Sequence, residues 1–359
     1  MDSPRSSEVL VIGGGPAGLA AAIAARHRGF EVTVMDRAVP PIDKACGEGI
    51  MPDGVAAARA LGIHVESAGA QRFAGICFKE DERSLEARFP GGDGLGLRRT
   101  ALHSLLIEHA AAEGVRLRWG ARIALDQLRA RWIIGAYGVN SAVRRWAGLE
   151  ASAHHHRRFG FRRQYRIAPW SQFMELHWSD GCQLYCTPVA ENEVCVASLS
   201  SDPRARLDQM LPRFPEVMRR LAGASGGAER GGISAQRRLR RVARGNVALI
   251  GDASGSVDAI TGEGLCLLFH QARALAAALA AGDLRVYEAS HRRIGLRAEW
   301  MAEAMLFVST HRRLRTRAFR ALAFQPQIFA RLLAMHVGEM PAPAALLNGV
   351  AFGWRMLRA

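Results

Sequence analysis

The chain has 359 residues, 49% of them hydrophobic and 23% charged, which is the composition of a folded globular protein long enough for two domains. Its formal net charge of +15 comes almost entirely from arginine, because Lys44 and Lys79 are the only lysines. No nucleic-acid-binding motif accompanies that charge, so we expect no nucleic-acid partner. The six cysteines form no CxxC pair and no zinc-like spacing with histidine, so we expect no metal site and a reduced, cytoplasmic protein.

The first element along the chain is a dinucleotide-binding βαβ unit over residues 7–36. An apolar strand runs into a glycine turn, an alanine-rich helix follows, and a second strand ends at Asp36. Gly13 permits the tight turn, Gly15 lets the backbone approach a pyrophosphate, and Gly18 lets the helix pack against the strand. The helix N-terminus offers unpaired N–H groups to phosphates, and Asp36 stands where a carboxylate accepts a ribose hydroxyl.

The middle of the chain alternates between strands and helices. After a loop over 40–54, the pattern predicts a helix at 52–61, strands within 72–98, a helix at 99–114 and strands at 115–118 and 132–134. Residues 156–200 have the alternation of consecutive antiparallel strands, and 203–224 are predicted to form a helix. A return strand at 247–250 then leads into Gly251 and Asp252, and a long helix over 262–281 follows.

The last part of the chain, residues 285–338, is predicted to be nearly all helical. A basic stretch at 312–317 lies beside apolar residues at helical spacing, which makes the segment amphipathic. Such a segment packs on the rest of the protein or lies on an anionic membrane surface, and the sequence leaves both alternatives open.

Three features that are common singly are, in combination, typical of one protein family. They are the glycine turn, the Gly251-Asp252 pair at a strand end, and Arg99 at a helix start. In this order and spacing they resemble the FAD-dependent oxidoreductases of the p-hydroxybenzoate hydroxylase fold, nearest its geranylgeranyl reductase and flavin-halogenase-like branches. The resemblance covers roughly residues 7–300.

The resemblance implies an α/β fold in which a Rossmann-type, GR2-like FAD-binding domain carries an inserted antiparallel β-sheet domain of α+β type and C-terminal helices. The FAD-binding domain is expected at 1–72, 99–150 and 240–300, and the substrate-binding domain at 73–98 and 151–239. A helical segment is expected at 301–359.

The resemblance also implies FAD as the bound cofactor, with NADH or NADPH as a transient reductant. By the family's pattern, Asp252 bonds the ribitol, Arg99 contacts FAD, and the helix start after Gly262 faces the flavin ring. The full set of expected cofactor-binding residues is Gly13, Gly15, Ala17, Gly18, Asp36, Arg37, Cys46, Gly47, Arg99, Gly251, Asp252, Gly262, Glu263, Gly264 and Leu265. One departure stands out, because Tyr137 takes the place of the aspartate that family members carry in Gly-Ala-Asp-Gly.

Two candidate catalytic residues lie in the loop that resembles the family's cysteine-containing loop beside the flavin. Cys46 is interpreted either as a thiol that donates a proton or tunes the ring, or as a small residue in a crowded loop. Glu48 is interpreted as a general acid whose pKa is raised by burial, or as a turn-capping carboxylate. Tyr185, His177 and Trp178 lie on strands of the expected substrate wall, and alternation alone does not say which of them face the cavity.

These features lead to three functional hypotheses. The first is a monooxygenase that hydroxylates an aromatic or apolar small molecule through a flavin C4a-hydroperoxide, with molecular oxygen as co-substrate. The second is a geranylgeranyl reductase-like enzyme that reduces isolated C=C bonds. The third, motivated by Tyr137, is a lipid- or prenyl-binding protein with little redox turnover. The further partners considered are an external flavin reductase and a peripheral membrane surface.

Overall fold

The computed structural model describes residues 8–122, 124–150 and 153–340. Its first sheet has the strand order β16-β17-β9-β1-β2-β8. Five of these strands run parallel to one another, namely β1 (Val9–Ile12), β2 (Val32–Met35), β8 (Arg116–Arg118), β9 (Trp132–Gly135) and β17 (Val247–Leu249). The short β16 (Ala243–Arg244) closes the edge in antiparallel orientation. A parallel sheet is covered on both faces, and the continuous apolar runs of β1, β9 and β17 fit that requirement.

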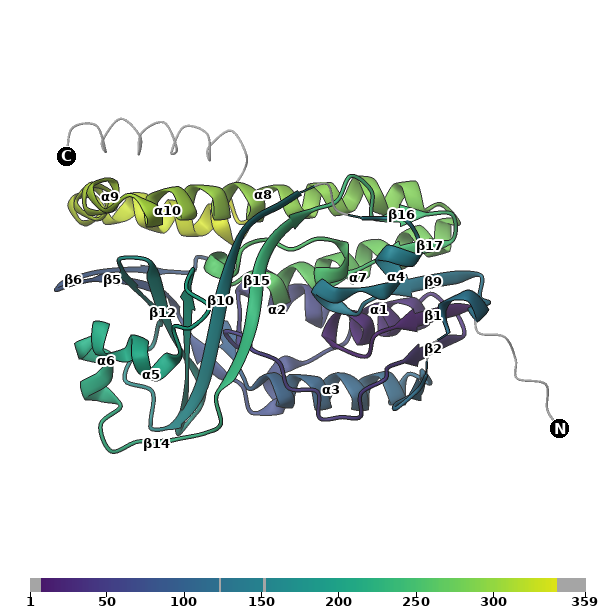
Figure 1. The fold of residues 1–359 in the computed structure, drawn as a ribbon, viewed down its shortest axis with the longest axis horizontal. Helices are drawn as coiled ribbons and strands as arrows, with labels where there is room; N and C mark the ends of the chain where they lie inside the picture. The colour runs from purple at the N-terminus through teal and green to yellow at the C-terminus, as the bar shows by residue number, and fades with distance from the viewer. Residues whose placement is uncertain (1–7, 123, 151–152, 341–359) are drawn as a thin grey trace.

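Helices cover both faces of this sheet (Figure 1). One face packs against α1 (Pro16–Arg26), α3 (Arg99–Ala112) and α7 (Gly264–Ala281), and α4 (Ala142–Trp146) lies on the other. Proline suits the first position of α1, because a helix start leaves its N–H groups unpaired and proline has none. Every residue of α1 from Gly18 to Ala25 is buried, so this helix is part of the core and its N-terminus is held rigidly.

The second sheet is mostly antiparallel and has the order β14-β10-β13-β12-β11-β5-β6, with β15 also paired to β10. Its strands are β5 (Gly75–Glu80), β6 (Arg83–Arg88), β10 (Ala153–Arg166), β11 (Met174–Ser179), β12 (Cys182–Ala190), β13 (Glu193–Ser200), β14 (Ser225–Gly226) and β15 (Arg230–Arg238). Thus strands from before and after α3 join one sheet. A small third sheet, β3-β7-β4, is built from β3 (Gly49–Ile50), β4 (Gln71–Phe73) and β7 (Gly94–Gly96), and α2 (Pro52–Arg59) follows β3.

Two predicted helices differ from the structure. The single helix predicted over 203–224 is wrong, because the chain forms the short helices α5 (Leu207–Met210) and α6 (Pro215–Arg220) instead. Pro212 and Pro215 lack the N–H that a continuous helix needs, so the helix is interrupted between them. The helix predicted to start at 262 starts at Gly264, because Gly262 has a φ of 69°, a left-handed conformation that a helix cannot contain.

The C-terminal part forms α8 (Leu284–Thr310), α9 (Arg312–Phe324) and α10 (Pro326–His336), a layer along one side of the molecule (Figure 1). The ring of Phe329 on α10 lies 4.8 Å from that of Phe78 on β5, measured between centroids, so this layer packs on the second sheet. Residues 341–359 of the predicted C-terminal segment lie outside the described residues. By length and composition α7 alone, among the helices described, could span a membrane, and 61% of it is buried in the protein.

Candidate active site

A cavity of about 780 Å³ lies between the two large sheets and is open to the surface. One side is formed by the N-terminus of α1, the start of α3 and the turn after β17. The opposite side is the face of the second sheet, which presents Met174, Tyr185, Ala197 and Leu199, together with Phe73 from β4 of the third sheet. The cavity therefore joins a polar, backbone-rich wall to an apolar one.

The glycine turn on the polar wall has the conformation that the sequence motif requires. Gly13 has a φ of 119°, and a Cβ added there would lie 2.6 Å from the carbonyl carbon of Ala136. A Cβ on Gly18 would lie 1.8 Å from the carbonyl oxygen of Gly13, so only glycine permits this packing of helix on turn. Gly15 faces the cavity, and a Cβ there would meet only Arg99, at 3.9 Å. The turn thus leaves its backbone open to a ligand at the start of α1.

Arg99 and Asp252 are the two charged groups on this wall. Arg99 is 8% exposed, and its Nη1 is buried without a hydrogen-bond partner. Burial lowers the pKa of the Arg99 guanidinium, against the raising effect of nearby anionic groups including Asp252. Asp252 is accessible through the cavity, yet the surrounding protein raises the pKa of its carboxyl, against the lowering effect of Lys44 and Arg99. A buried cation without a partner is the state expected of a residue that waits for an anionic ligand.

A hydrogen-bond network on the cavity wall holds the Gly251-Asp252 turn. Gln271 on α7 accepts a bond from the Gly251 N–H at 2.9 Å, and the Ser254 hydroxyl lies 2.7 Å from the Gly251 carbonyl oxygen. The Ser254 hydroxyl also lies 2.8 Å from Nε2 of His291 on α8. Burial lowers the pKa of His291 to about 4, so at neutral pH this imidazole is uncharged.

The carboxylate at the end of β2 finds its hydrogen-bond partners within the protein. The Asp36 carboxylate accepts bonds from the Gly14 N–H at 2.7 Å, the Ala38 N–H at 2.8 Å and the Tyr137 hydroxyl at 3.1 Å. The same hydroxyl accepts the Arg37 N–H at 2.7 Å, and the Arg37 guanidinium lies 5.7 Å from the centre of the Tyr137 ring. Tyr137 therefore ties the end of β9 to the end of β2, a connection that the sequence did not reveal.

The loop with the two candidate catalytic residues folds onto the cavity. Glu48 has a φ of 60°, is 1% exposed and accepts the Arg99 N–H at 2.9 Å, so it caps the start of α3. Gln164 also donates to it at 2.8 Å. Burial raises the pKa of Glu48, against these bonds and the charge of Arg162. Burial likewise raises the pKa of the Cys46 thiol, which keeps it protonated on the cavity wall.

The three residues predicted for the substrate wall lie in three different places, and strand alternation accounts only for His177. Tyr185 lines the cavity, and its hydroxyl donates to the Ile260 carbonyl at 3.0 Å. His177 points to the other face of the sheet, where its Nε2 lies 2.9 Å from Glu175 and its ring contacts Phe214. Trp178 packs in the main core against Phe78. His177 and Trp178 do not line the cavity.

Only some of the predicted cofactor-binding residues line the cavity. It is lined by Gly15, Ala17, Cys46, Gly47, Arg99, Gly251, Asp252, Gly262, Gly264 and Leu265, but not by Gly13, Gly18, Asp36, Arg37 or Glu263. Sequence reasoning missed the apolar wall residues Phe73, Met174 and Leu199. Strand periodicity marks them as apolar, but only the register of the folded sheet turns them toward the cavity.

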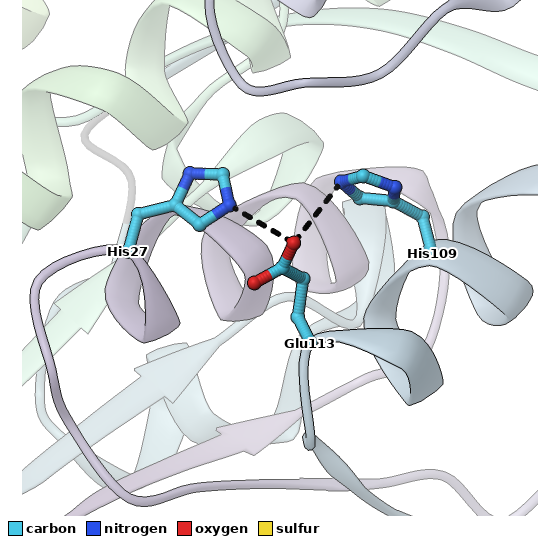
Figure 2. Close-up of side chains that lie close together, drawn as sticks. All are labelled: His27, His109 and Glu113. Atoms are coloured by element: carbon cyan, nitrogen blue, oxygen red, sulfur yellow. Dashed lines mark ion pairs between the residues drawn. The ribbon is translucent and has the colours of Figure 1, made fainter.

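Two clusters of potential metal ligands lie away from this cavity. In Figure 2, Glu113 points between His27 and His109, with its Oε1 3.5 Å and 3.9 Å from their Nε2 atoms. The second cluster is Glu175, His177 and Cys186, buried on the far face of the second sheet. The prediction that the chain binds no metal stays a prediction.

Comparisons with known proteins agree with this geometry. Residues 6–127 match a family described as "FAD binding domain". The chain is 27% identical over 324 residues to a menaquinone reductase of Mycobacterium tuberculosis, which covers 79% of each protein. It is 26% identical over 248 residues to a putative FAD-dependent monooxygenase, YetM, of Bacillus subtilis, which covers 61% of this chain and 66% of YetM.

Among solved structures, a flavoprotein/dehydrogenase from Cytophaga hutchinsonii superimposes with a TM-score of 0.80. The two proteins share 17% sequence identity, and the match covers 92% of each chain. At that identity the likeness shows the fold. The predicted fold class is confirmed: the chain has the p-hydroxybenzoate hydroxylase-like fold, and its first 127 residues include a match to an FAD-binding domain.

Proposed function

We propose that the protein is an FAD-dependent monooxygenase that hydroxylates an aromatic or apolar small molecule. The observation that carries this proposal is the cavity in which the polar wall faces the apolar residues Phe73, Met174 and Leu199. The reaction consumes one O2 and one NADH or NADPH, places one oxygen atom in a new C–O bond of the substrate and releases the other as water. FAD supplies the chemistry that carries electrons from the nicotinamide to oxygen.

The residues present fit FAD. The α1 N-terminus and Arg99, with its unpartnered Nη1, would hold the pyrophosphate, and Asp252 would hold the ribitol. The start of α7, at Gly264 and Leu265, would face the flavin ring. The apolar wall would orient the substrate and limit the water around it. Both effects favour transfer of the oxygen atom to the substrate over its release as hydrogen peroxide.

Reduction and oxygen use can be tested in two steps with purified holoprotein. An anaerobic titration with NADH and NADPH, followed by visible absorbance, is expected to bleach the flavin bands. Oxygen uptake that depends on an added phenolic or polycyclic substrate, with an oxygenated product by mass spectrometry, is then expected. Reduction by dithionite but not by either nicotinamide would instead indicate an external flavin reductase as partner. A protein that does not take up FAD would contradict the proposal altogether.

A second candidate is reduction of a C=C bond in an apolar substrate, and the Cys46 thiol is the observation that favours it. This thiol is kept protonated on the cavity wall, whereas the Glu48 carboxylate is engaged by the start of α3. The relative matched over 79% of this chain is by its name a reductase of menaquinone, which is an apolar substrate. In this reaction bound FAD, reduced by NADH or NADPH, would supply the hydride to one carbon. The Cys46 thiol would donate a proton to the other carbon and regain one from solvent. Anaerobic saturation of an isoprenoid double bond by the wild type, and its loss in Cys46→Ala, would favour the reductase over the monooxygenase.

A further inference from the structure

The mouth of the cavity is bordered by exposed apolar side chains. Ile233 on β15 and Leu296 on α8 both line the cavity, and they are 54% and 63% exposed. Trp300, one turn after Leu296, is 52% exposed, and Phe307, two turns further on the same face, is 59% exposed. Figure 1 shows β15 running up to α8, and an ion pair from Arg238 to Glu299 joins the two elements. Large apolar side chains grouped in this way on a surface mark a site of interaction.

Cations surround this apolar border. Arg238, Arg240, Arg292 and Arg293 are exposed, and the first three line the cavity. The nearby acids, Glu299 and Glu303, are both paired with Arg238. Arg292, Leu296 and Trp300 follow one another at intervals of one turn on α8, so the cation and the apolar residues share one face of the helix. The mouth is therefore apolar and positively charged at once, which is the pattern of a surface that binds at a lipid headgroup boundary.

We propose that the rim of the cavity, defined by Ile233, Leu296, Trp300 and Phe307 with Arg240 and Arg292, docks on an anionic lipid bilayer and admits an apolar substrate from it. This inference rests on the proposed function, because it names the source of the substrate for the same cavity. A substrate that enters through this rim passes from hydrocarbon to the apolar wall without crossing water. The membrane contact proposed here is thus at the mouth of the active site, whereas the sequence had suggested the basic segment at 312–317.

Charge favours a bilayer over two other occupants of the rim. A second copy of this chain would bring the same exposed arginines against each other, which is unfavourable. Residues 341–359 contain Arg355 and Arg358 and no acidic residue, so they match this rim poorly in charge. An anionic lipid surface supplies the complementary charge to the arginines and accepts the apolar side chains.

The test is co-sedimentation of the full-length holoprotein with vesicles of phosphatidylcholine, alone or mixed with phosphatidylglycerol. We expect binding to the mixed vesicles that weakens as salt is raised, and little binding to phosphatidylcholine alone. The double variant Leu296→Ser/Trp300→Ser is expected to reduce the partition coefficient roughly tenfold, because two apolar side chains no longer insert. Val286→Ser removes a side chain on the same helix that is 46% exposed and does not line the cavity, and it should bind as the wild type does.

Electrostatic attraction is tested with Arg240→Gln/Arg292→Gln, for which we expect roughly tenfold weaker binding to the mixed vesicles. Arg28→Gln/Arg145→Gln changes net charge equally at exposed positions outside the cavity lining, and it should have little effect. Absence of binding by the wild type, or equal binding by the rim and control variants, would overturn the proposal. So would a wild-type dimer in sedimentation velocity that the rim variant abolishes. Because no turnover is measured, failure here is distinct from failure of the oxygen-uptake experiment.

Discussion

The two ends of the nucleotide-binding wall differ in how well the protein satisfies its own polar groups. At the tip of β2, the Asp36 carboxylate is bonded by Gly14, Ala38 and Tyr137. At the cavity end, Arg99 keeps a buried nitrogen without a partner, and Asp252 is open to the cavity. The hydrogen-bonded groups at the first end stabilise the local structure. At the second end, burial of a polar group without a partner costs free energy, and a bound ligand would offset that cost. The cavity end is therefore where FAD should contribute most to stability.

The largest effect is expected from His291, which lines the cavity at this end of the wall. Its pKa is about 4 in the folded protein and 6.5 ordinarily, so between these values the unfolded chain binds a proton that the folded protein does not. The free energy of unfolding should therefore fall as pH is lowered from about 6.5 to 4, with about 3 kcal/mol of the loss due to His291. Urea unfolding of the wild type and His291→Gln at several pH values should show a smaller acid loss in the variant.

Other groups also titrate in this interval, so a matched histidine is needed as a control. His64 has a side chain that is 65% exposed, and His64→Gln should keep the acid loss of the wild type. If His291→Gln and His64→Gln have the same pH dependence, the imidazole of His291 is not held neutral by burial, and the cavity end does not carry the cost assigned to it.

The second effect concerns the unpartnered guanidinium itself. Arg99→Met keeps the length of the side chain and the backbone N–H that Glu48 accepts, but it removes the charge. Loss of a charge-assisted bond to a phosphate should weaken FAD binding by about 2 kcal/mol, roughly thirtyfold. The dissociation constant can be measured by flavin fluorescence during titration of FAD into apoprotein. Arg98→Met is the control, because Arg98 is already paired with Glu193, and equal affinities in the two variants would contradict the role of Arg99.

The motifs that act through the backbone were predictable from sequence. The glycine turn, the Gly251-Asp252 pair and Arg99 each depend on a local conformation that residue type dictates, and the structure brings them to one wall. The strands of the second sheet were also predictable, because their alternation is visible along the chain. The faces of those strands were not, since Tyr185 and His177 have the same local pattern and only packing sends one to the cavity.

Long-range polar contacts were beyond the sequence for a different reason. Glu48 caps a helix that begins 51 residues later, and Tyr137 bonds a carboxylate 101 residues earlier. Neither contact has a spacing rule, because the partners are distant in sequence and meet only in the tertiary arrangement of the folded chain. For that reason the two interpretations of Glu48, general acid or turn-capping carboxylate, and the role of Tyr137 stayed open at the level of sequence.

The smallest effect is expected at the satisfied end, from Tyr137→Phe. Its hydroxyl donates to Asp36 and accepts the Arg37 N–H, so its removal leaves both groups with one bond fewer but keeps the ring packed. Neither bond is fully buried, so at about 0.5 kcal/mol for each the free energy of unfolding of the apoprotein should fall by about 1 kcal/mol, and FAD affinity should fall about fivefold at most. Tyr165→Phe, which removes a hydroxyl that lies outside the cavity lining and 3.5 Å from Arg163, is the matched control. If Tyr137→Phe binds FAD as weakly as Arg99→Met while apoprotein stability is unchanged, Tyr137 is itself a cofactor ligand, and the two ends of the wall are alike.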